Sequence, residues 1–164
     1  GQERVGALAM KSSVLTTSST PRVATLPSPH LSRPHLYVVS WAGDGKRHQP
    51  VQITRGSWAV LSVEVVDDSC EDVVVVWFMA CGIVPDQDPY YAHLCRVVLP
   101  PNASGATSVN ATAASGSSLV AVLTHDANGT HSVDLSPDRR VFVDTWSRVD
   151  LPPVVQVRGC APGT

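Results

Sequence analysis

Histidine and carboxylate side chains near the end of the chain have the residue types needed for proton transfer. His131 is followed by Asp134 and Asp138, and a histidine beside a carboxylate is the usual arrangement of a general base with its orienting group. Successive residues of a β-strand point to opposite faces, so His131 and Asp134 would lie on opposite sides of a sheet. We therefore expect no catalytic pair from these residues.

A second polar group follows a few residues later and ends in two prolines. Arg148 has a guanidinium group that can bridge neighbouring carboxylates in bidentate fashion. We predict an architectural network that holds the exit of the last strands, formed by Asp144, Arg148, Asp150, Pro152 and Pro153. The prolines are expected to steer the chain away from the preceding strand.

Metal and cofactor sites are not indicated. The acidic group Asp67, Asp68, Glu71 and Asp72 could bind a cation, but solvated carboxylates are ordinary in a hairpin turn, and we favour that interpretation. The cysteines have no C-x-x-C pair and no histidine at zinc-site spacing; they are Cys70, Cys81, Cys95 and Cys160. We expect no cofactor and no metal, and leave open one disulfide in an oxidising compartment.

Short strands are the elements that must position these side chains. The chain has 164 residues, of which 43% are hydrophobic, which is enough for a folded core. Runs of β-branched residues between turn residues predict strands at 35–41, 50–56, 58–66, 73–81, 93–99, 119–126, 131–136, 140–146 and 154–159. The continuous apolar run 73–81 is typical of a strand that is buried on both faces. No amphipathic helix stands out, so the predicted class is all-β.

The domain prediction follows from composition. Residues 1–34 are rich in Ser, Thr and Pro and are expected to form a flexible leader. Residues 35–159 form the β-rich unit, which a low-complexity insertion interrupts at 100–118. Residues 160–164 are a tail.

An internal repeat divides the β-rich unit. His35-Leu36 is echoed by His93-Leu94, 58 residues on. Each pair is followed by a strand that ends in an aliphatic residue and a threonine, and then by a glycine-containing turn; these residues are Thr54, Gly56, Thr124 and Gly129. The period predicts two four-stranded antiparallel blades of an incomplete β-propeller, at 35–81 and 93–147. A β-sandwich is the alternative. Because a recurring residue usually has a recurring structural task, we interpret both histidines as structural.

Four stretches also resemble a known family. They are PHLYVVS, PVQITRGSWAV, DPYYAHLCRVVLP and GTHSVDLSPDRRVFVDTWSRVDLPPVVQVR, which together span roughly residues 33–158. They are similar to the late part of the N-terminal β-propeller in the dipeptidyl peptidase IV-like branch of the prolyl oligopeptidase family of serine peptidases. The resemblance implies a parent enzyme that removes dipeptides from peptide amino termini, with a propeller that limits access to an α/β-hydrolase domain.

The residues for that catalysis are not found in this sequence. Its nucleophile would lie in a G-x-S-x-G turn; Ser57 and Ser117 follow glycines but lack the second glycine. The family's paired glutamates and its hydrolase domain are also not found. We expect no catalytic residues in these 164 residues, a structural and substrate-access role, and peptide substrates only through a catalytic domain. A standalone β-rich protein-binding module is the alternative.

Charge and hydropathy limit the partners. A net charge of −2 and an aromatic content of 5% do not favour nucleic acid, and no apolar run approaches the roughly 20 residues that span a bilayer. The sequence begins without a secretory signal pattern, which favours a cytoplasmic location. Because two blades cannot close a ring, we expect self-association through open strand edges.

Overall fold

The described part of the chain is made of antiparallel strands. The computed structural model describes residues 22–27, 33–39, 49–70, 73–99 and 120–160. These ranges contain ten β-strands and no helix, which confirms the all-β prediction. Consequently, no helix in these ranges can cross a membrane.

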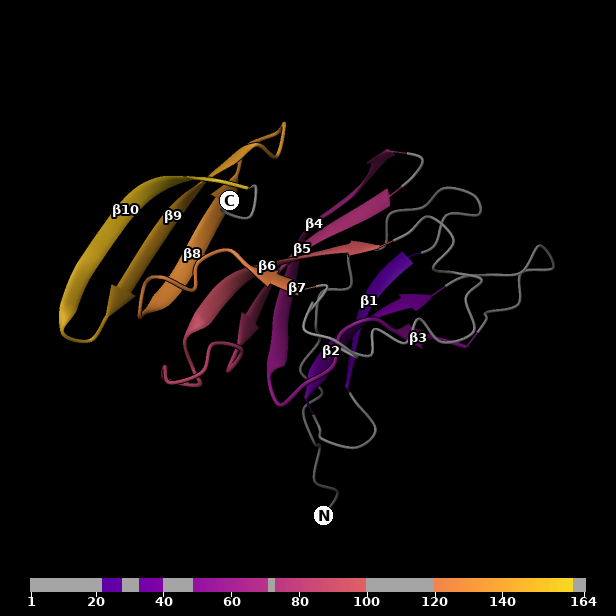
Figure 1. The fold of residues 1–164 in the computed structure, drawn as a ribbon, viewed down its shortest axis with the longest axis horizontal. Coiled ribbons are helices and arrows are strands. Elements are labelled where there is room, and N and C mark those ends of the chain that lie inside the picture. Colours follow the sequence, from indigo (N-terminus) through magenta and orange to yellow (C-terminus); the bar gives the residue numbers. More distant parts are fainter. Residues whose placement is uncertain (1–21, 28–32, 40–48, 71–72, 100–119, 161–164) are drawn as a thin grey trace, which may run out of the picture.

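The strands form three open sheets, each wholly antiparallel (Figure 1). The first sheet has the order β1-β2-β3, from β1 (Arg22–Pro27), β2 (Pro34–Val39) and β3 (Val51–Gln52). The second has the order β4-β5-β6-β7, from β4 (Ala59–Cys70), β5 (Val73–Cys81), β6 (Ala92–Leu99) and β7 (Val120–Val122). The third has the order β10-β9-β8, from β8 (Thr130–Leu135), β9 (Val141–Arg148) and β10 (Leu151–Gly159).

The strand pairing corrects the predicted grouping into blades. The predicted unit 35–81 joined β2 and β3 to β4 and β5, but these pairs belong to different sheets. The reason is that β5 pairs with β6 along its whole length, from Val74 opposite Leu99 to Cys81 opposite Ala92. The boundary between sheets therefore falls after each aliphatic-threonine segment, at about residues 53–58 and 123–129, and not before the histidines.

The predicted flexible leader also needs a correction. Within residues 1–34, β1 is a strand whose register against β2 runs from Arg22 opposite Val39 to Pro27 opposite Pro34. Alternating small and β-branched residues in RVATLP suit a strand once β2 supplies a partner. The remaining leader residues before β1, the predicted insertion at 100–118 and the tail at 161–164 lie outside the described residues.

Two separate cores hold the sheets in three layers. Phe78, Val76 and Leu36 belong to a cluster between the first and second sheets, and Trp77, Leu94 and Phe142 belong to one between the second and third. Alternate residues of β5 enter opposite cores, which confirms that this strand is buried on both faces. A sandwich has two layers, so this arrangement replaces that alternative and is consistent with partial propeller blades.

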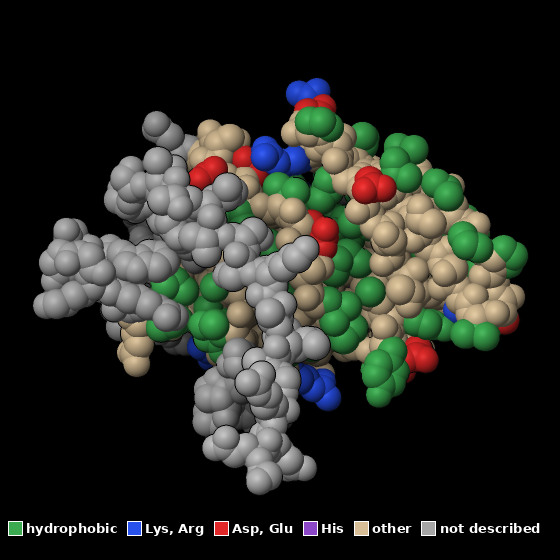
Figure 2. Space-filling model, turned by 180° about the vertical axis from the view of Figure 1, so that it is seen from behind, with side chains coloured by type: hydrophobic (Ala, Val, Ile, Leu, Met, Phe, Trp, Pro, Cys, Tyr) green, Lys and Arg blue, Asp and Glu red, His purple; other side chains and the backbone are tan. Residues whose placement is uncertain are grey.

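The outer face of the third sheet carries four exposed valines beside the polar Ser132, Asp134 and Thr145. Val143 lies opposite Val157 in the β9–β10 pair, and Val155 and Val141 occupy the same face. All four valines are exposed, and Val157 keeps 72% of its accessible surface. Figure 2 shows hydrophobic side chains at the surface on this side of the molecule. The equivalent face of the second sheet is the one that the third sheet covers.

The end of the chain does not leave the sheet as predicted. After Asp150 the chain reverses, and β10 runs back along β9 from Leu151 opposite Arg148 to Gly159 opposite Val141. Pro152 and Pro153 lie within β10, where the register shifts between Leu151 and Val154. A bulge leaves residues out of the hydrogen-bonded ladder, so two residues without an N–H group are tolerated there.

Candidate functional site

The recurring histidines make the same contact at two places. In β2, Nδ1 of His35 is 3.3 Å from the Thr54 hydroxyl, which also accepts the N–H of Leu36 at 2.9 Å. In β6, Nδ1 of His93 is 3.3 Å from Oγ1 of Thr124, which accepts the N–H of Leu94 at 3.0 Å. All these histidine and threonine side chains are buried. Each contact is therefore a structural clip. The first fastens the segment after β3 to β2, and the second fastens the segment after β7 to β6.

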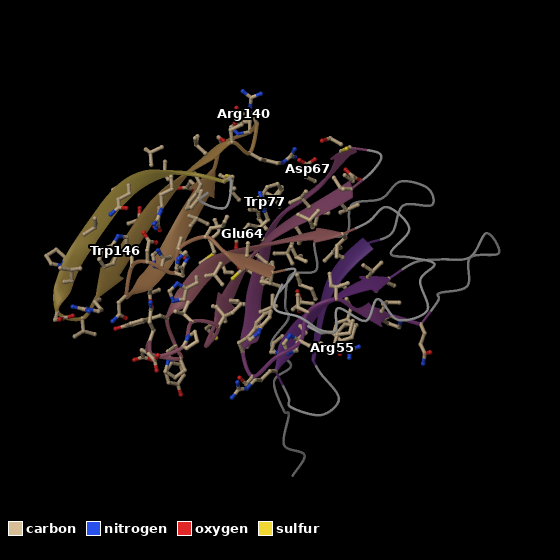
Figure 3. All side chains as sticks on the ribbon, viewed as in Figure 1. Arg55, Glu64, Asp67, Trp77, Arg140 and Trp146 are labelled. Carbon is tan, nitrogen blue, oxygen red and sulfur yellow. The ribbon has the colours of Figure 1, made fainter. Side chains whose placement is uncertain are left out.

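Three neighbouring rings, called the ring tier below, lie beside each clip at the junction where one sheet packs on the next. At the first junction the ring of His35 is 5.1 Å from that of Trp58, which is 6.1 Å from Phe78. At the second junction the ring of His93 is 5.0 Å from that of His131, which is 6.2 Å from Trp146. His131 thus occupies the place of Trp58, and Trp146, labelled in Figure 3, that of Phe78.

The carboxylate partner of His131 is Asp144, not Asp134 or Asp138. Nδ1 of His131 is 2.8 Å from Oδ1 of Asp144, and neither side chain is exposed to solvent. In the β8–β9 pair, His131 lies opposite Trp146 and Val133 opposite Asp144, so the acid and the base share one face. The register, in which Leu135 lies opposite Phe142, produces this pairing, because hairpin register decides which residues share a face.

The predicted network at the chain exit is divided between two places. Arg148 makes a bidentate contact with Asp150, with Nε 2.7 Å from Oδ1 and Nη2 3.0 Å from Oδ2. This contact lowers the pKa of Asp150 and lies at the exposed β9–β10 turn. Asp144 contacts neither residue; its Oδ2 instead accepts a hydrogen bond from Nη1 of Arg158 at 3.0 Å. Sequence reasoning missed Arg158, because only the return of β10 along β9 brings it to Asp144.

A shallow groove of about 210 Å³ lies beside the second junction. Its lining is divided evenly between apolar and polar residues. Its one carboxylate, Glu64, accepts a hydrogen bond from the hydroxyl of Ser62. Figure 3 shows Glu64 between the second and third sheets. The groove is lined by Leu61, Ser62, Glu64, Met79, Ala92, His131, Ser132 and Val133. The imidazole of His131 is buried and bonded through both nitrogens, so it cannot serve as a base for a molecule in this groove.

Other candidate ligands stay apart. Asp67 contacts the Ser69 N–H at 3.0 Å and Arg139 at 3.0 Å; the hydrogen bonds from Ser69 are the main cause of its lowered pKa. Glu71 and Asp72 lie outside the described residues. No group of three or more potential metal ligands occurs among the residues that the structure describes. All four cysteines have free thiols, and burial raises the pKa of both Cys95 and Cys160.

Burial of His35 predicts a loss of stability in acid. Burial and the nearby Arg33 lower the pKa of His35 from 6.5, so the folded chain binds fewer protons at this site than the unfolded chain. This site's contribution is therefore complete above pH 6.5 and declines as the pH falls below it, with a slope of up to about 1.4 kcal/mol per pH unit. Urea unfolding of the wild type and of His35→Asn from pH 7.5 to 5.5 measures the effect. Equal slopes in the two proteins would contradict it.

The stacking of the sheets indicates the class of protein to which this chain belongs. Three open antiparallel sheets are stacked face to face, with the same clip and ring tier at both junctions, which is the construction of a repeat protein built from β-sheet units. Residues 12–153 match the family described as Dipeptidyl peptidase IV (DPP IV) N-terminal region. The chain belongs to that family. The match confirms the resemblance and starts well before residue 33, within the predicted leader. No curated protein matches the chain.

Proposed function

We propose that this chain is part of the N-terminal propeller region of a dipeptidyl peptidase IV-like serine peptidase. Its role is structural and concerns substrate access, and these residues alone perform no catalysis. The observation that carries the proposal is the clip of His35 with Thr54 and His93 with Thr124, which recurs where one sheet meets the next. Such a recurrence is what stacked blades require, and membership of the family supplies the context.

The chemistry of the described residues supports a role without catalysis. His131 and Asp144 form the one buried acid–base pair among these residues, and solvent reaches neither side chain. Ser57 is exposed but has no neighbouring glycine two residues later. Arg148 and Asp150 close the β9–β10 turn, so we assign them, with Asp144, Pro152 and Pro153, an architectural role at the third sheet.

Hydrolysis of a glycyl-prolyl chromogenic substrate tests this proposal directly. We expect no turnover by the purified chain. Turnover that persists through repeated purification and is blocked by an organophosphate would overturn it. The organophosphate distinguishes a serine nucleophile in this chain from a contaminating peptidase with another mechanism.

A protein-binding module is the second candidate, because an exposed apolar face usually marks an interaction site. Val143, Val155 and Val157 form such a face on the third sheet, and β10 is the last strand in that sheet's order. Peptide binding would then use this face or the β10 edge. The two candidates differ in what covers the face: a further sheet stacked as the third sheet covers the second, or a separate partner.

Self-association through this part of the third sheet is the expected result for the isolated chain. We predict that sedimentation shows oligomers whose fraction rises with protein concentration, because the valine face and the β10 edge are both open. The double variant Val155→Lys, Val157→Lys should be monomeric at the same concentration. Val149→Lys is the matched control, because Val149 is fully exposed at the turn. A monomeric wild type at high concentration would contradict the prediction.

A further inference from the structure

Four ionisable side chains form a chain of contacts, acid and base in alternation, at the junction of the second and third sheets. Asp126 follows β7 and contacts Nη2 of Arg158 on β10. Nη1 of Arg158 is 3.0 Å from Oδ2 of Asp144 on β9, and Oδ1 of Asp144 is 2.8 Å from Nδ1 of His131 on β8. The cluster therefore ties the segment between β7 and β8 to all three strands of the third sheet.

Both ring nitrogens of His131 face acceptors. Nδ1 faces a carboxylate oxygen of Asp144, and Nε2 is 3.2 Å from the carbonyl oxygen of Ala127. A carbonyl oxygen can only accept, and so can an aspartate carboxylate, whose other oxygen in Asp144 receives a hydrogen bond from the Arg158 guanidinium. A neutral imidazole has one N–H group and can satisfy one of these contacts, whereas an imidazolium satisfies both.

We propose that His131 carries a proton on both nitrogens in the folded chain and that the cluster of Asp126, Arg158, Asp144 and His131 is a pH-sensitive lock between the second and third sheets. Loss of the His131 proton removes one hydrogen bond and leaves the cluster with a net negative charge. The segment 126–130 is then released from the third sheet. The lock is closed in acid and neutral solution and opens as the solution becomes alkaline.

The first junction shows no counterpart of the His131–Asp144 pair among the described residues. Trp58 holds the place of His131, because it follows Gly56 by two residues as His131 follows Gly129. Val76, however, lies opposite Val66, eight residues after Trp58, whereas Asp144 lies opposite Val133, two residues after His131. The acid and the base occur together at the second junction, as a buried ion pair requires, because either charged residue alone would be unpaired.

The remaining groups around His131 fit its positive charge. His93 on β6 needs one proton only, because its Nδ1 bonds to the carbonyl oxygen of Thr124 at 3.2 Å and its Nε2 has no partner. Burial, together with the charge of His131, lowers the pKa of His93, which favours the neutral form of the His93 ring beside His131. Glu64 on β4 shares the groove with His131, and His125 lies on the same segment as Asp126.

The sign of the pH effect follows from the unfolded reference. An unfolded histidine loses its proton near pH 6.5. Because the lock needs the second proton of His131, its contribution is complete in acid and is lost as the pH rises. Opening of the segment should increase by up to about tenfold per pH unit in this range.

Nitrogen-15 NMR of the histidine rings at about pH 7.5 is the direct test. We expect both nitrogens of His131 to be protonated, and His93, as an internal control in the same spectrum, to show one protonated and one bare nitrogen. Asp144→Asn should convert His131 to a neutral ring. A neutral His131 ring in the wild type at this pH would overturn the proposal.

Hydrogen exchange supplies an independent readout. After correction for intrinsic rates, the amides of residues 126–130 should open more often by up to about tenfold per pH unit between about pH 7 and 9. The double variant His131→Trp, Asp144→Val removes the base and the acid together and should abolish this dependence. If the wild type shows no such dependence, the lock is excluded. If the variant fails to fold, the ring spectrum of the wild type still decides.

Discussion

Replacing Phe78 with alanine is expected to lower the free energy of unfolding by about 3–5 kcal/mol. Phe78 has no exposed surface and lies in the core between the first and second sheets, stacked on Trp58. Its removal leaves a cavity that two rigid sheets cannot easily close, so the lost packing adds to the lost hydrophobic transfer energy. Urea unfolding of the full chain, monitored by tryptophan fluorescence, measures the change.

Val98→Ala is the matched control for this experiment. Val98 lies on β6, next to β5, but is 37% exposed. We expect a loss of less than about 1.5 kcal/mol, because a partly exposed valine loses less buried surface and creates no closed cavity. A loss for Phe78→Ala as small as that of the control would show that the first and second sheets do not pack around Phe78.

Replacing Asp144 with alanine is the second large effect, and we expect a loss of about 3–5 kcal/mol. The carboxylate is completely buried and accepts from both His131 and Arg158. Its removal leaves the buried Nδ1 of His131 and the partly buried Nη1 of Arg158 without this acceptor, and this cost is larger than the net value of the intact pair. Chemical unfolding at neutral pH is the measurement, and near-ultraviolet circular dichroism should report looser packing around Trp146.

Asp150→Ala is the natural control, because Asp150 is also an aspartate bound by an arginine of the third sheet. Its contact with Arg148 is exposed to solvent at a turn, where ion pairs contribute little. We therefore expect its unfolding midpoint to stay close to that of the wild type. Equal losses for the two aspartates would mean that burial does not distinguish them, contrary to the structure.

The strands and the repeat were predictable because both leave a local signal. Runs of β-branched and apolar residues predicted β5, β6 and β8 close to their observed bounds, and His35 and His93 recur with threonines that make the same contact. Sheet membership was not predictable in the same way. β3 pairs over only two residues, so its sequence could equally well join the preceding or the following strands.

The candidate site was harder to predict because its members come from separate strands. Asp134 is closer to His131 in sequence, but strand alternation places it on the other face, and the true partner lies across the hairpin. Arg158 reaches Asp144 only because β10 folds back along β9. The prolines at 152 and 153 argue against such a strand, because they cannot donate backbone hydrogen bonds. The bulge between Leu151 and Val154 resolves that conflict, because it removes the need for their N–H groups.

Composition, strand pattern and the lack of a G-x-S-x-G turn are properties of the amino-acid sequence itself, and they can be known for this chain without coordinates. The stacking of three sheets, the burial of Asp144 and the two acceptors around His131 depend on contacts between residues far apart along the chain, such as Asp126 and Arg158, 32 residues apart. Hydrogen-bond partners and burial set a side chain's protonation and its contribution to stability. Only the tertiary structure determines these partners and this burial, because it alone brings the strands together.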